Sequence, residues 1–404
     1  MLDQLFPIHS HAVRGVPQNI RRYLYNQIRW SSKTLCLSGA RGVGKTTLLI
    51  QHYFEAYKNV EKCLYVSADN IHVASTGLFA IAQEYFKYGG EAIIIDEVHK
   101  YPQWPTEVKN IVDTYREKKL LLSGSSAIAL TKGIADLSRR IVSYDLGGLS
   151  FREYLSFVKG SPFPAFSLED IFKRHVAIAG KISEQLTSDD PVLKHFRNYL
   201  RHGYYPFFIE GIDDYFPKLE NVIAKVLGED IPAAFNITPA KIIPLKKMLW
   251  LIATSQPFLP NIERMSQSLN LSKESTYGFL EYLERAGLVR FIFPQGRGHK
   301  LVRKPGKVLL SNTNLLETIT GSLNLASDTG GVRESFFASQ LQGHKLKMGD
   351  SADFLVDDRY TVEVGGASKN LGQIKGKEEA YLALDNIEIG AGKRIPLYLF
   401  GFLY

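Results

Sequence analysis

The stretch KTLCLSGARGVGKTTLLIQHYF, residues 33–54, decides the fold. An apolar run, a glycine-rich loop and a second apolar run follow one another directly, which predicts a strand, a loop and a helix. The loop from Gly39 to Thr46 fits the spacing G-x-x-x-x-G-K-[ST]. Glycines let the backbone curl so that successive N–H groups point at phosphate oxygens, and a helix that begins near Gly44 adds the positive end of its dipole. The stretch therefore predicts a phosphate-binding loop between a strand and a helix.

Two side chains of this loop are expected to contact the ligand directly. Lys45 would reach the β- and γ-phosphates of a nucleotide, and Thr46 would be a ligand of Mg²⁺. The residues predicted to bind the nucleotide are Gly39, Ala40, Arg41, Gly42, Val43, Gly44, Lys45, Thr46 and Thr47. The alternative interpretation is a glycine turn that carries a surface lysine.

A second stretch, EAIIIDEVHK at residues 91–100, completes the expected site. Its β-branched run, Ile93 to Ile95, is typical of a strand buried on both faces of a parallel sheet. The run ends in Asp96, which would hold Mg²⁺, and in Glu97, which would polarise the attacking water as the catalytic base. A strand that merely ends in solvated acids is the alternative.

The next strand and its successor supply two further candidates. LLLSGSSA leaves Ser123 at the C-terminal end of a strand, where open parallel sheets place residues that face a ligand. Ser123 would contact the γ-phosphate or the attacking water, or would only cap the next turn. In LSRRIVSYDL, Arg140 or Arg139 would stabilise the charge of the transition state, in cis or toward a neighbouring subunit, or would be a surface residue. No N-K-x-D motif for guanine occurs, so ATP is the expected nucleotide.

These motifs carry a family resemblance. GARGVGKT, IIIDEVHKYPQW, LLSGSSA and LSRRIVSYDLGGLSFREY resemble the prokaryotic AAA+ ATPases found in Bacteroidetes and archaea, and the resemblance extends over nearly the whole chain. It implies an AAA+ type parallel sheet followed by a C-terminal region of uncharacterised function. The family has Gly-Arg where this chain has Arg139-Arg140, so the resemblance aligns Arg140 with the arginine of the family.

Composition agrees with a cytoplasmic protein. The chain has 404 residues, of which 45% are hydrophobic and 22% charged, as in ordinary soluble proteins with packed cores. No apolar run is long enough for a membrane span, and the N-terminus lacks the order of a signal peptide. Cys36 and Cys63 lie in apolar runs and are expected to be buried, reduced thiols. The net charge of +8 permits a nucleic-acid partner without requiring one.

Helical patterns follow the first 150 residues. Residues 166–186, 191–211 and 215–231 have helical spacing with glycine or proline breaks, and they predict a small helical lid beside the nucleotide. Residues 244–310 then show three apolar stripes of helical spacing and two short strand patterns, the elements of a winged helix.

Most of the excess charge lies in this winged-helix segment. Between Ile243 and Leu310, eleven Lys and Arg face four Glu and no Asp, which gives +7. The loop between the two expected strands would bind DNA phosphates with Arg297, Lys300, Arg303 and Lys304. Glu274 and Glu281 on the third helix oppose a DNA groove, so a protein partner or self-association is the other interpretation.

Three acidic residues mark the last segment. Glu334 lies in a predicted helix, whereas Asp353 and Glu363 lie in a pair of predicted strands. This layout resembles the PD-(D/E)xK nucleases, whose strand carboxylates hold Mg²⁺ beside a lysine. Here Gly365 stands at the lysine position, and Lys369 lies four residues further on. We expect a further helix over residues 375–385 and a buried strand over 396–404.

Together these observations predict an α/β chain of the P-loop NTPase class. Its expected parts are an AAA+ ATPase core at 1–150, a helical lid at 151–240, a winged helix at 241–312 and a small nuclease-like α/β domain without nuclease activity at 313–404. The expected function is hydrolysis of ATP with Mg²⁺, coupled to DNA or protein binding by the C-terminal region. A nucleotide-gated switch with little turnover and an ATP-regulated DNA nuclease are the alternatives.

Overall fold

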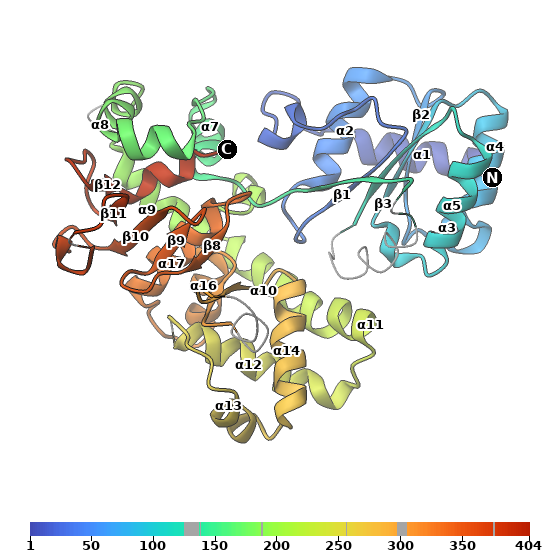
Figure 1. Cartoon of the computed structure of the whole chain (residues 1–404). Coiled ribbons are helices and arrows are strands. Elements are labelled where there is room, and N and C mark those ends of the chain that lie inside the picture. Colours follow the sequence, from blue (N-terminus) through green and yellow to red (C-terminus); the bar gives the residue numbers. More distant parts are fainter. Residues whose placement is uncertain (125–136, 138, 187–188, 256, 297–304, 375) are drawn as a thin grey trace. The chain divides into compact units, whose positions relative to one another are not determined.

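The computed structural model describes all residues except 125–136, 138, 187–188, 256, 297–304 and 375. Contacts divide the chain into two compact units, Met1–Gly148 and Leu149–Tyr404 (Figure 1). Among the described residues, no helix combines the length and apolar character needed to cross a membrane.

The N-terminal unit contains a five-stranded parallel sheet in the order β2-β3-β4-β1-β5. The strands are β1 (Thr34–Ser38), β2 (Cys63–Ser67), β3 (Ala92–Asp96), β4 (Lys119–Ser123) and β5 (Val142–Asp145). Because all five are parallel, their C-terminal ends lie at one edge of the sheet, where open α/β sheets bind ligands. The expected α/β fold with a parallel sheet is therefore confirmed.

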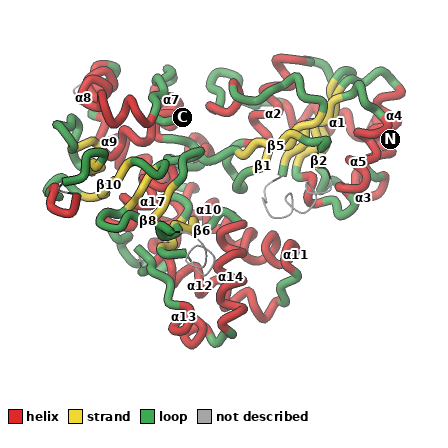
Figure 2. Tube along the Cα trace, in the orientation of Figure 1, coloured by secondary structure: helices red, strands yellow, loops and turns green. Residues whose placement is uncertain are grey.

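Helices cover this sheet on both sides (Figure 2). They are α1 (Leu2–Val13), α2 (Lys45–Ala56), α3 (Ile71–Thr76), α4 (Leu78–Lys87) and α5 (Trp104–Thr114), with short 3₁₀ turns η1 (Tyr23–Asn26) and η2 (Val98–Lys100). The inner strands are buried on both faces, as their continuous apolar runs predict. Both cysteines are free and buried, and burial raises the pKa of Cys36 to about 12.

The C-terminal unit begins with helices. They are α7 (Phe151–Lys159), α8 (Leu168–Glu184), α9 (Val192–His202), α10 (Tyr215–Lys225), the π-helix η4 (Val226–Asp230) and α11 (Ile231–Phe235), with 3₁₀ turns η3 (Pro206–Glu210) and η5 (Pro239–Lys241). The helical patterns predicted for residues 166–186, 191–211 and 215–231 are confirmed.

In the segment expected to be a winged helix, the residues that the structure describes form three helices and a two-stranded antiparallel sheet. They are α12 (Ile242–Thr254), α13 (Ile262–Leu269), α14 (Lys273–Arg285), β6 (Val289–Ile292) and β7 (Lys307–Leu310). The Ser272 hydroxyl caps α14 by accepting a hydrogen bond from the N–H of Ser275. Arg297, Lys300, Arg303 and Lys304 lie outside the described residues, and the winged-helix assignment stays a prediction.

The last segment contains α16 (Thr313–Ser322), α17 (Thr329–Gln340) and a five-stranded mixed sheet in the order β12-β11-β10-β9-β8. Its strands are β8 (Leu346–Met348), β9 (Phe354–Val356), β10 (Tyr360–Gly365), β11 (Ala380–Leu384) and β12 (Arg394–Pro396), with 3₁₀ helices η6 (Leu371–Ile374) and η7 (Leu397–Phe402).

Two sequence expectations for this segment are wrong. The run expected to be a helix at 375–385 contains β11, which pairs in parallel with both β10 and β12. The run expected to be a buried strand at 396–404 forms the 3₁₀ helix η7 instead. Short runs that are apolar on every side fit a buried helix and a buried strand equally well, and only tertiary pairing separates the two.

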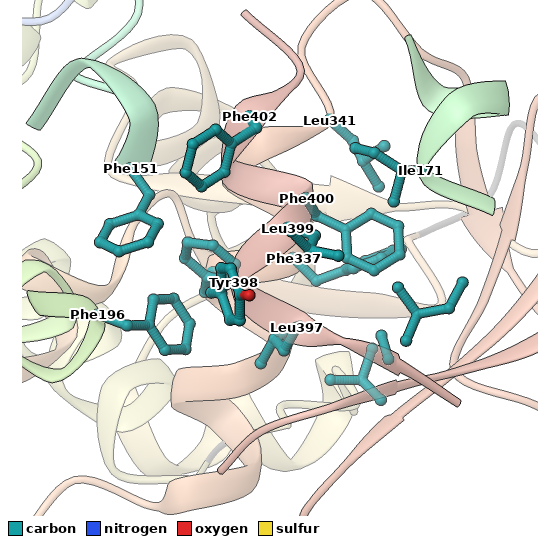
Figure 3. Packing of buried hydrophobic residues seen from close by; sticks show 14 of the residues in the cluster. Phe151, Ile171, Phe196, Phe337, Leu341, Leu397, Tyr398, Leu399, Phe400 and Phe402 are labelled. Carbon is teal, nitrogen blue, oxygen red and sulfur yellow. The ribbon is translucent and has the colours of Figure 1, made fainter. Parts of the chain in front are cut away.

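One hydrophobic cluster joins both ends of the C-terminal unit. Phe151 of α7 and Phe196 of α9 pack with Tyr398 and Phe402 of η7 (Figure 3). A side chain at Gly401 would overlap the Cβ atom of Phe151, so only glycine allows this close approach of η7 to α7. Helices expected to belong to a lid therefore share a core with the last segment of the chain, and the division of residues 151–404 into three domains stays a prediction.

Phe151→Ala tests this shared core. We expect the substitution to lower the free energy of unfolding of the C-terminal unit by about 3–5 kcal/mol, because it leaves a large cavity beside η7. Hydrogen exchange of the most protected amides in α9 and α17 would measure the loss. Val158→Ala on the same helix is the control, since Val158 is 41% exposed and its truncation should cost less than about 0.5 kcal/mol. Equal effects of the two substitutions would contradict the shared core.

Candidate nucleotide-binding site

The phosphate loop has a backbone that its glycines make possible. Gly42 and Gly44 have φ angles of 86° and 96°, and α2 begins directly after Gly44. Gly39 has a φ of 147°, and a Cβ atom there would overlap the carbonyl oxygen of Leu146. Side chains other than hydrogen would be strained at these positions. The loop therefore follows β1 and opens α2, as its spacing predicts.

Lys45 points back into this loop. Its ammonium donates hydrogen bonds of 2.9 Å to the carbonyl oxygens of Gly39 and Ala40. The side chain is buried, and burial lowers the pKa of Lys45, whereas the nearby carboxylates of Glu97 and Asp96 raise it. Burial disfavours the charged form of Lys45, and its two hydrogen-bond acceptors are neutral. A bound anion would favour the protonated ammonium, so this position favours anion binding.

The Asp96 carboxylate accepts hydrogen bonds from hydroxyl groups of α2, β2 and β4. The Thr46 hydroxyl donates to Oδ2 over 2.7 Å, the Tyr65 hydroxyl donates to Oδ2 over 2.9 Å, and the Ser123 hydroxyl donates to Oδ1. Strand register brings them together, because β4 lies between β1 and β3 and Leu37 pairs with Ser123. Thr46, Asp96 and Ser123 therefore meet at the C-terminal edge of the sheet.

These oxygen atoms fit a magnesium ion. Mg²⁺ prefers hard oxygen ligands and binds through one or two protein groups together with phosphate oxygens. The Thr46 hydroxyl and the Asp96 carboxylate supply such ligands within 2.7 Å of each other, and Thr46 directly follows Lys45 at the start of α2. The two residues predicted to hold the metal are thus adjacent.

Glu97 lies at the margin of the site. Its backbone is left-handed, with φ 50° and ψ 39°, which is uncommon for a residue other than glycine and is often found at functional sites. Its Oε2 atom lies 4.0 Å from Nη2 of Arg41 and 3.5 Å from Nε2 of His99. The N–H of Glu97 contacts the Ser123 hydroxyl over 3.4 Å. The predicted base is therefore held next to the phosphate loop, and its role stays a prediction.

Arg140 does not take part in the contacts around Asp96. Its guanidinium forms two hydrogen bonds, of 2.8 and 3.0 Å, to the carboxylate of Asp113 in α5. The pair is exposed to solvent, where such ion pairs contribute little to stability. Arg140 and its neighbour Arg139 follow a segment outside the described residues, and a role for either in charge stabilisation stays a prediction.

Sequence reasoning missed Tyr65, His99 and Arg22. His99 was within reach, since it follows Glu97 by two residues in the same motif. Tyr65 was not, because only the strand order places β2 beside β3. Burial, assisted by the carboxylate of Asp96, raises the pKa of Tyr65, so its hydroxyl remains a hydrogen-bond donor. The Arg22 guanidinium donates a 2.6 Å hydrogen bond to the carbonyl oxygen of Val43 in the phosphate loop, and no local sequence pattern indicates this contact.

The three acidic residues of the last segment also come together. Each strand carboxylate accepts a backbone hydrogen bond: Asp353 N–H donates to Glu363 over 3.0 Å, and Val364 N–H donates to Asp353 over 2.9 Å. Burial raises the pKa of Glu334 to about 7 and also raises the pKa of Glu363. The layout predicted for Glu334, Asp353 and Glu363 is thus present in space.

Two lysines neutralise this acidic cluster. Lys307 of β7 is buried and donates to Glu334 over 2.6 Å, with its ammonium 3.5 Å from Asp353. Lys369 pairs with Glu363, and its side chain covers Gly365, where an added Cβ atom would lie 2.9 Å from the Lys369 chain. The three carboxylates already form ion pairs with Lys307 and Lys369. A divalent cation would have to displace these ammonium groups, so this arrangement does not fit a metal site. Among the described residues, no group of three or more His, Cys, Asp or Glu side chains is arranged as a metal site.

Comparison with known families agrees with the first site. Residues 31–155 match the family model described as an AAA domain. The N-terminal unit has a P-loop AAA+ fold. Residues 193–326 match a second model, described as a domain of unknown function (DUF8612), which runs from α9 into α16 and the turn after it.

Relatives and solved structures extend the comparison. An uncharacterized protein of Methanocaldococcus jannaschii is 25% identical over 403 residues, which cover 92% of this chain and 83% of that protein. AMPPCP-bound DnaA from Aquifex aeolicus aligns with a TM-score of 0.28 and 14% identity over 70% of this chain and 87% of DnaA. The S. cerevisiae Hsp104–ADP complex aligns with a TM-score of 0.27 and 13% identity over 69% of this chain and 39% of Hsp104. The fold assignment rests on the sheet topology and the AAA match rather than on these two structures.

Lys307→Met tests the neutralised acidic cluster. The substitution removes the ammonium and leaves Glu334 and Asp353 without their cation, so we expect lower stability and a new affinity for Mn²⁺. Thermal unfolding with and without Mn²⁺ measures both effects. Wild type and the exposed-site control Lys345→Met should show no rise in Tm with the metal, whereas Lys307→Met should gain several degrees. The interpretation would be contradicted if Mn²⁺ raised the Tm of wild type as much as that of Lys307→Met and if Glu363→Gln abolished this rise in wild type.

Proposed function

We propose that the N-terminal unit binds ATP with Mg²⁺ and hydrolyses it. The observation that carries the proposal is the convergence of Lys45, Thr46, Asp96 and Ser123 at one edge of the sheet, with Glu97 beside them. The N–H groups of the loop and the N-terminus of α2 would receive the phosphates. Lys45 would exchange two neutral carbonyl partners for phosphate oxygens, which is favourable because both sides of the new contact are charged.

The chemical step assigns a role to each polar group. A water molecule attacks the γ-phosphorus, its proton passes to a carboxylate oxygen of Glu97, and the bond to the β,γ-bridging oxygen breaks to release ADP and phosphate. Thr46 and Asp96 would hold Mg²⁺, which when bound would neutralise charge on the phosphate oxygens. Ser123 keeps the Asp96 carboxylate and the Glu97 backbone in place, and Arg41 and His99 hold Glu97 on the side of the phosphate loop.

We propose the C-terminal unit as the region that passes nucleotide state to a partner. The exposed face of α14 offers a DNA groove little free charge, because Lys273 pairs with Glu263 over 3.1 Å and Arg285 pairs with Glu281 over 2.6 Å. Phosphate contacts would therefore come chiefly from the basic segment between β6 and β7. The alternative is a protein partner or a second copy of this chain. The DNA-stimulation assay described below distinguishes DNA from these partners.

Lys45→Ala and Glu97→Gln test the site in two steps. We expect Lys45→Ala to weaken ATP binding by about 100-fold or more, since it removes a buried charge from the phosphates. Glu97→Gln should keep binding and lower phosphate release by roughly 10²–10⁴-fold, because it removes the base alone. Equilibrium titration with a fluorescent ATP analogue and steady-state phosphate release measure these effects.

A lysine outside the site provides the control for both measurements. Lys33→Ala removes an exposed lysine that pairs with Glu117 and should behave as wild type. Normal ATP affinity in Lys45→Ala would overturn the assignment of the phosphate loop. Tight binding with negligible turnover in wild type would instead identify a nucleotide-gated switch.

Double-stranded DNA tests the partner. If the basic segment contacts phosphates, DNA should raise the ATPase rate at low salt, and the stimulation should fall steeply as salt rises, because bound cations are displaced from DNA on binding. The rate is measured at two salt concentrations with a neutral polymer of equal mass as the control. No stimulation at low salt would contradict DNA contact and favour the protein partner.

A further inference from the structure

Arg22 bridges three parts of the N-terminal unit that are distant in sequence. Its Nη1 atom donates a 2.6 Å hydrogen bond to the carbonyl oxygen of Val43 in the phosphate loop. Its Nη2 atom donates 2.8 Å hydrogen bonds to the carbonyl oxygens of Gly147 and Gly148. Those two glycines are the last residues before the C-terminal unit. A single guanidinium therefore contacts both the phosphate loop and the connector to the second unit.

The guanidinium is held firmly in this position. Arg22 is only 4% exposed, and the segment before it is fixed to α2 by Gln51, whose amide donates to the carbonyl oxygens of Pro17 and Ile20 over 2.7 and 3.0 Å. Hydrogen bonds from an ionised donor are shorter and stronger than neutral ones. A fork of five N–H groups lets arginine serve several carbonyls at once, which a lysine cannot do with the same geometry.

The contact with Val43 bears on the phosphate loop itself. In a trans peptide the C=O of one residue and the N–H of the next point in opposite directions. Arg22 holds the Val43 carbonyl and thereby orients the N–H of Gly44, the residue at the N-terminus of α2. A phosphate that engages this N–H would pull on the same peptide that Arg22 holds from the other side.

The connector is packed against the loop at a second point. The N–H of Leu146 donates to the carbonyl oxygen of Ser38 over 2.8 Å, and its own carbonyl leaves room only for glycine at position 39. The two following glycines lack side chains, so their backbone can rotate at low steric cost. A shift of the phosphate loop can therefore reach the connector through Leu146 and through Arg22.

We propose that Arg22 is a positioning residue that transmits occupancy of the phosphate loop to the connector Gly147–Gly148. The proposal rests on the proposed binding of ATP and names the path by which that binding is communicated. Nucleotide fixes the peptide between Val43 and Gly44, the guanidinium follows its carbonyl partner, and the bonds to the connector tighten. Without nucleotide the peptide between Val43 and Gly44 lacks this second restraint, so the connector amides should exchange faster.

Hydrogen exchange of the full chain, with and without AMPPCP and Mg²⁺, tests this path. In wild type we expect nucleotide to slow exchange in a peptide over residues 144–152 by roughly tenfold, with the same concentration midpoint as the phosphate loop. In Arg22→Lys, saturating nucleotide should still protect the loop, but the connector should lose most of its added protection, because only the contact through Leu146 remains. Arg21→Lys is the matched control, since the adjacent Arg21 pairs with Glu55 instead, and it should respond as wild type.

Each outcome decides the proposal. A connector that responds equally in Arg22→Lys and in wild type overturns the role of Arg22. Protection of the wild-type loop without any response of the connector overturns the coupling and leaves ATP binding intact. If neither segment of wild type is protected, the proposed function fails as well. Should Arg22→Lys not fold, the comparison of the two midpoints in wild type still decides whether the connector follows the loop.

Discussion

A buried ammonium needs oxygen partners, and the arrangement of the N-terminal unit follows from how Lys45 obtains them. Its two acceptors are the carbonyls of Gly39 and Ala40, which turn inward only because the loop is rich in glycine. Desolvation opposes the charge at this position, and two neutral carbonyls compensate it only in part. An anion is the partner that would complete the compensation. The Asp96 carboxylate lies near Lys45 but accepts its hydrogen bonds from the hydroxyls of Thr46 and Ser123.

The C-terminal unit also contains a buried lysine, but carboxylates rather than carbonyls compensate its charge. Lys307 is also buried, but its partners are the carboxylates of Glu334 and Asp353. Removing one member of such a pair is strongly destabilising, because the remaining charge stays buried without compensation. Lys45 can therefore leave its carbonyl partners for a ligand at little cost, whereas Lys307 cannot leave its carboxylates. This difference separates a ligand site from a structural ion-pair cluster, although both contain a buried lysine near acidic residues.

The sequence predicts features that depend on neighbouring residues better than features that depend on long-range packing. The strand that ends in Asp96 and the loop before α2 were readable because their chemistry depends on neighbouring residues. Residues Ala380–Leu384 and Leu397–Phe402 were assigned to the wrong type of element, since apolar runs buried on every side have no distinguishing period. Lys307 and Arg22 were missed for a different reason. Each acts on residues that the fold alone brings near, and no spacing within the chain indicates those contacts.

The first residues of the C-terminal unit form hydrogen bonds with residues from the middle and the end of that unit. The N–H of Leu149 donates to the carbonyl of Tyr204 over 2.8 Å, and the Ser150 hydroxyl donates to the carbonyl of the last residue, Tyr404, over 2.8 Å. Ser150 also caps α7 through a reciprocal bond with Glu153, so the entering chain is fixed within one turn. Phe151 follows directly and lies in the cluster that includes η7. Leu149 and Ser150, the first two residues of the C-terminal unit, are therefore held by hydrogen bonds within that unit before α7 begins. Arg22 holds the carbonyl oxygens of Gly147 and Gly148, and these glycines directly precede the two residues that the C-terminal unit fixes through its own hydrogen bonds.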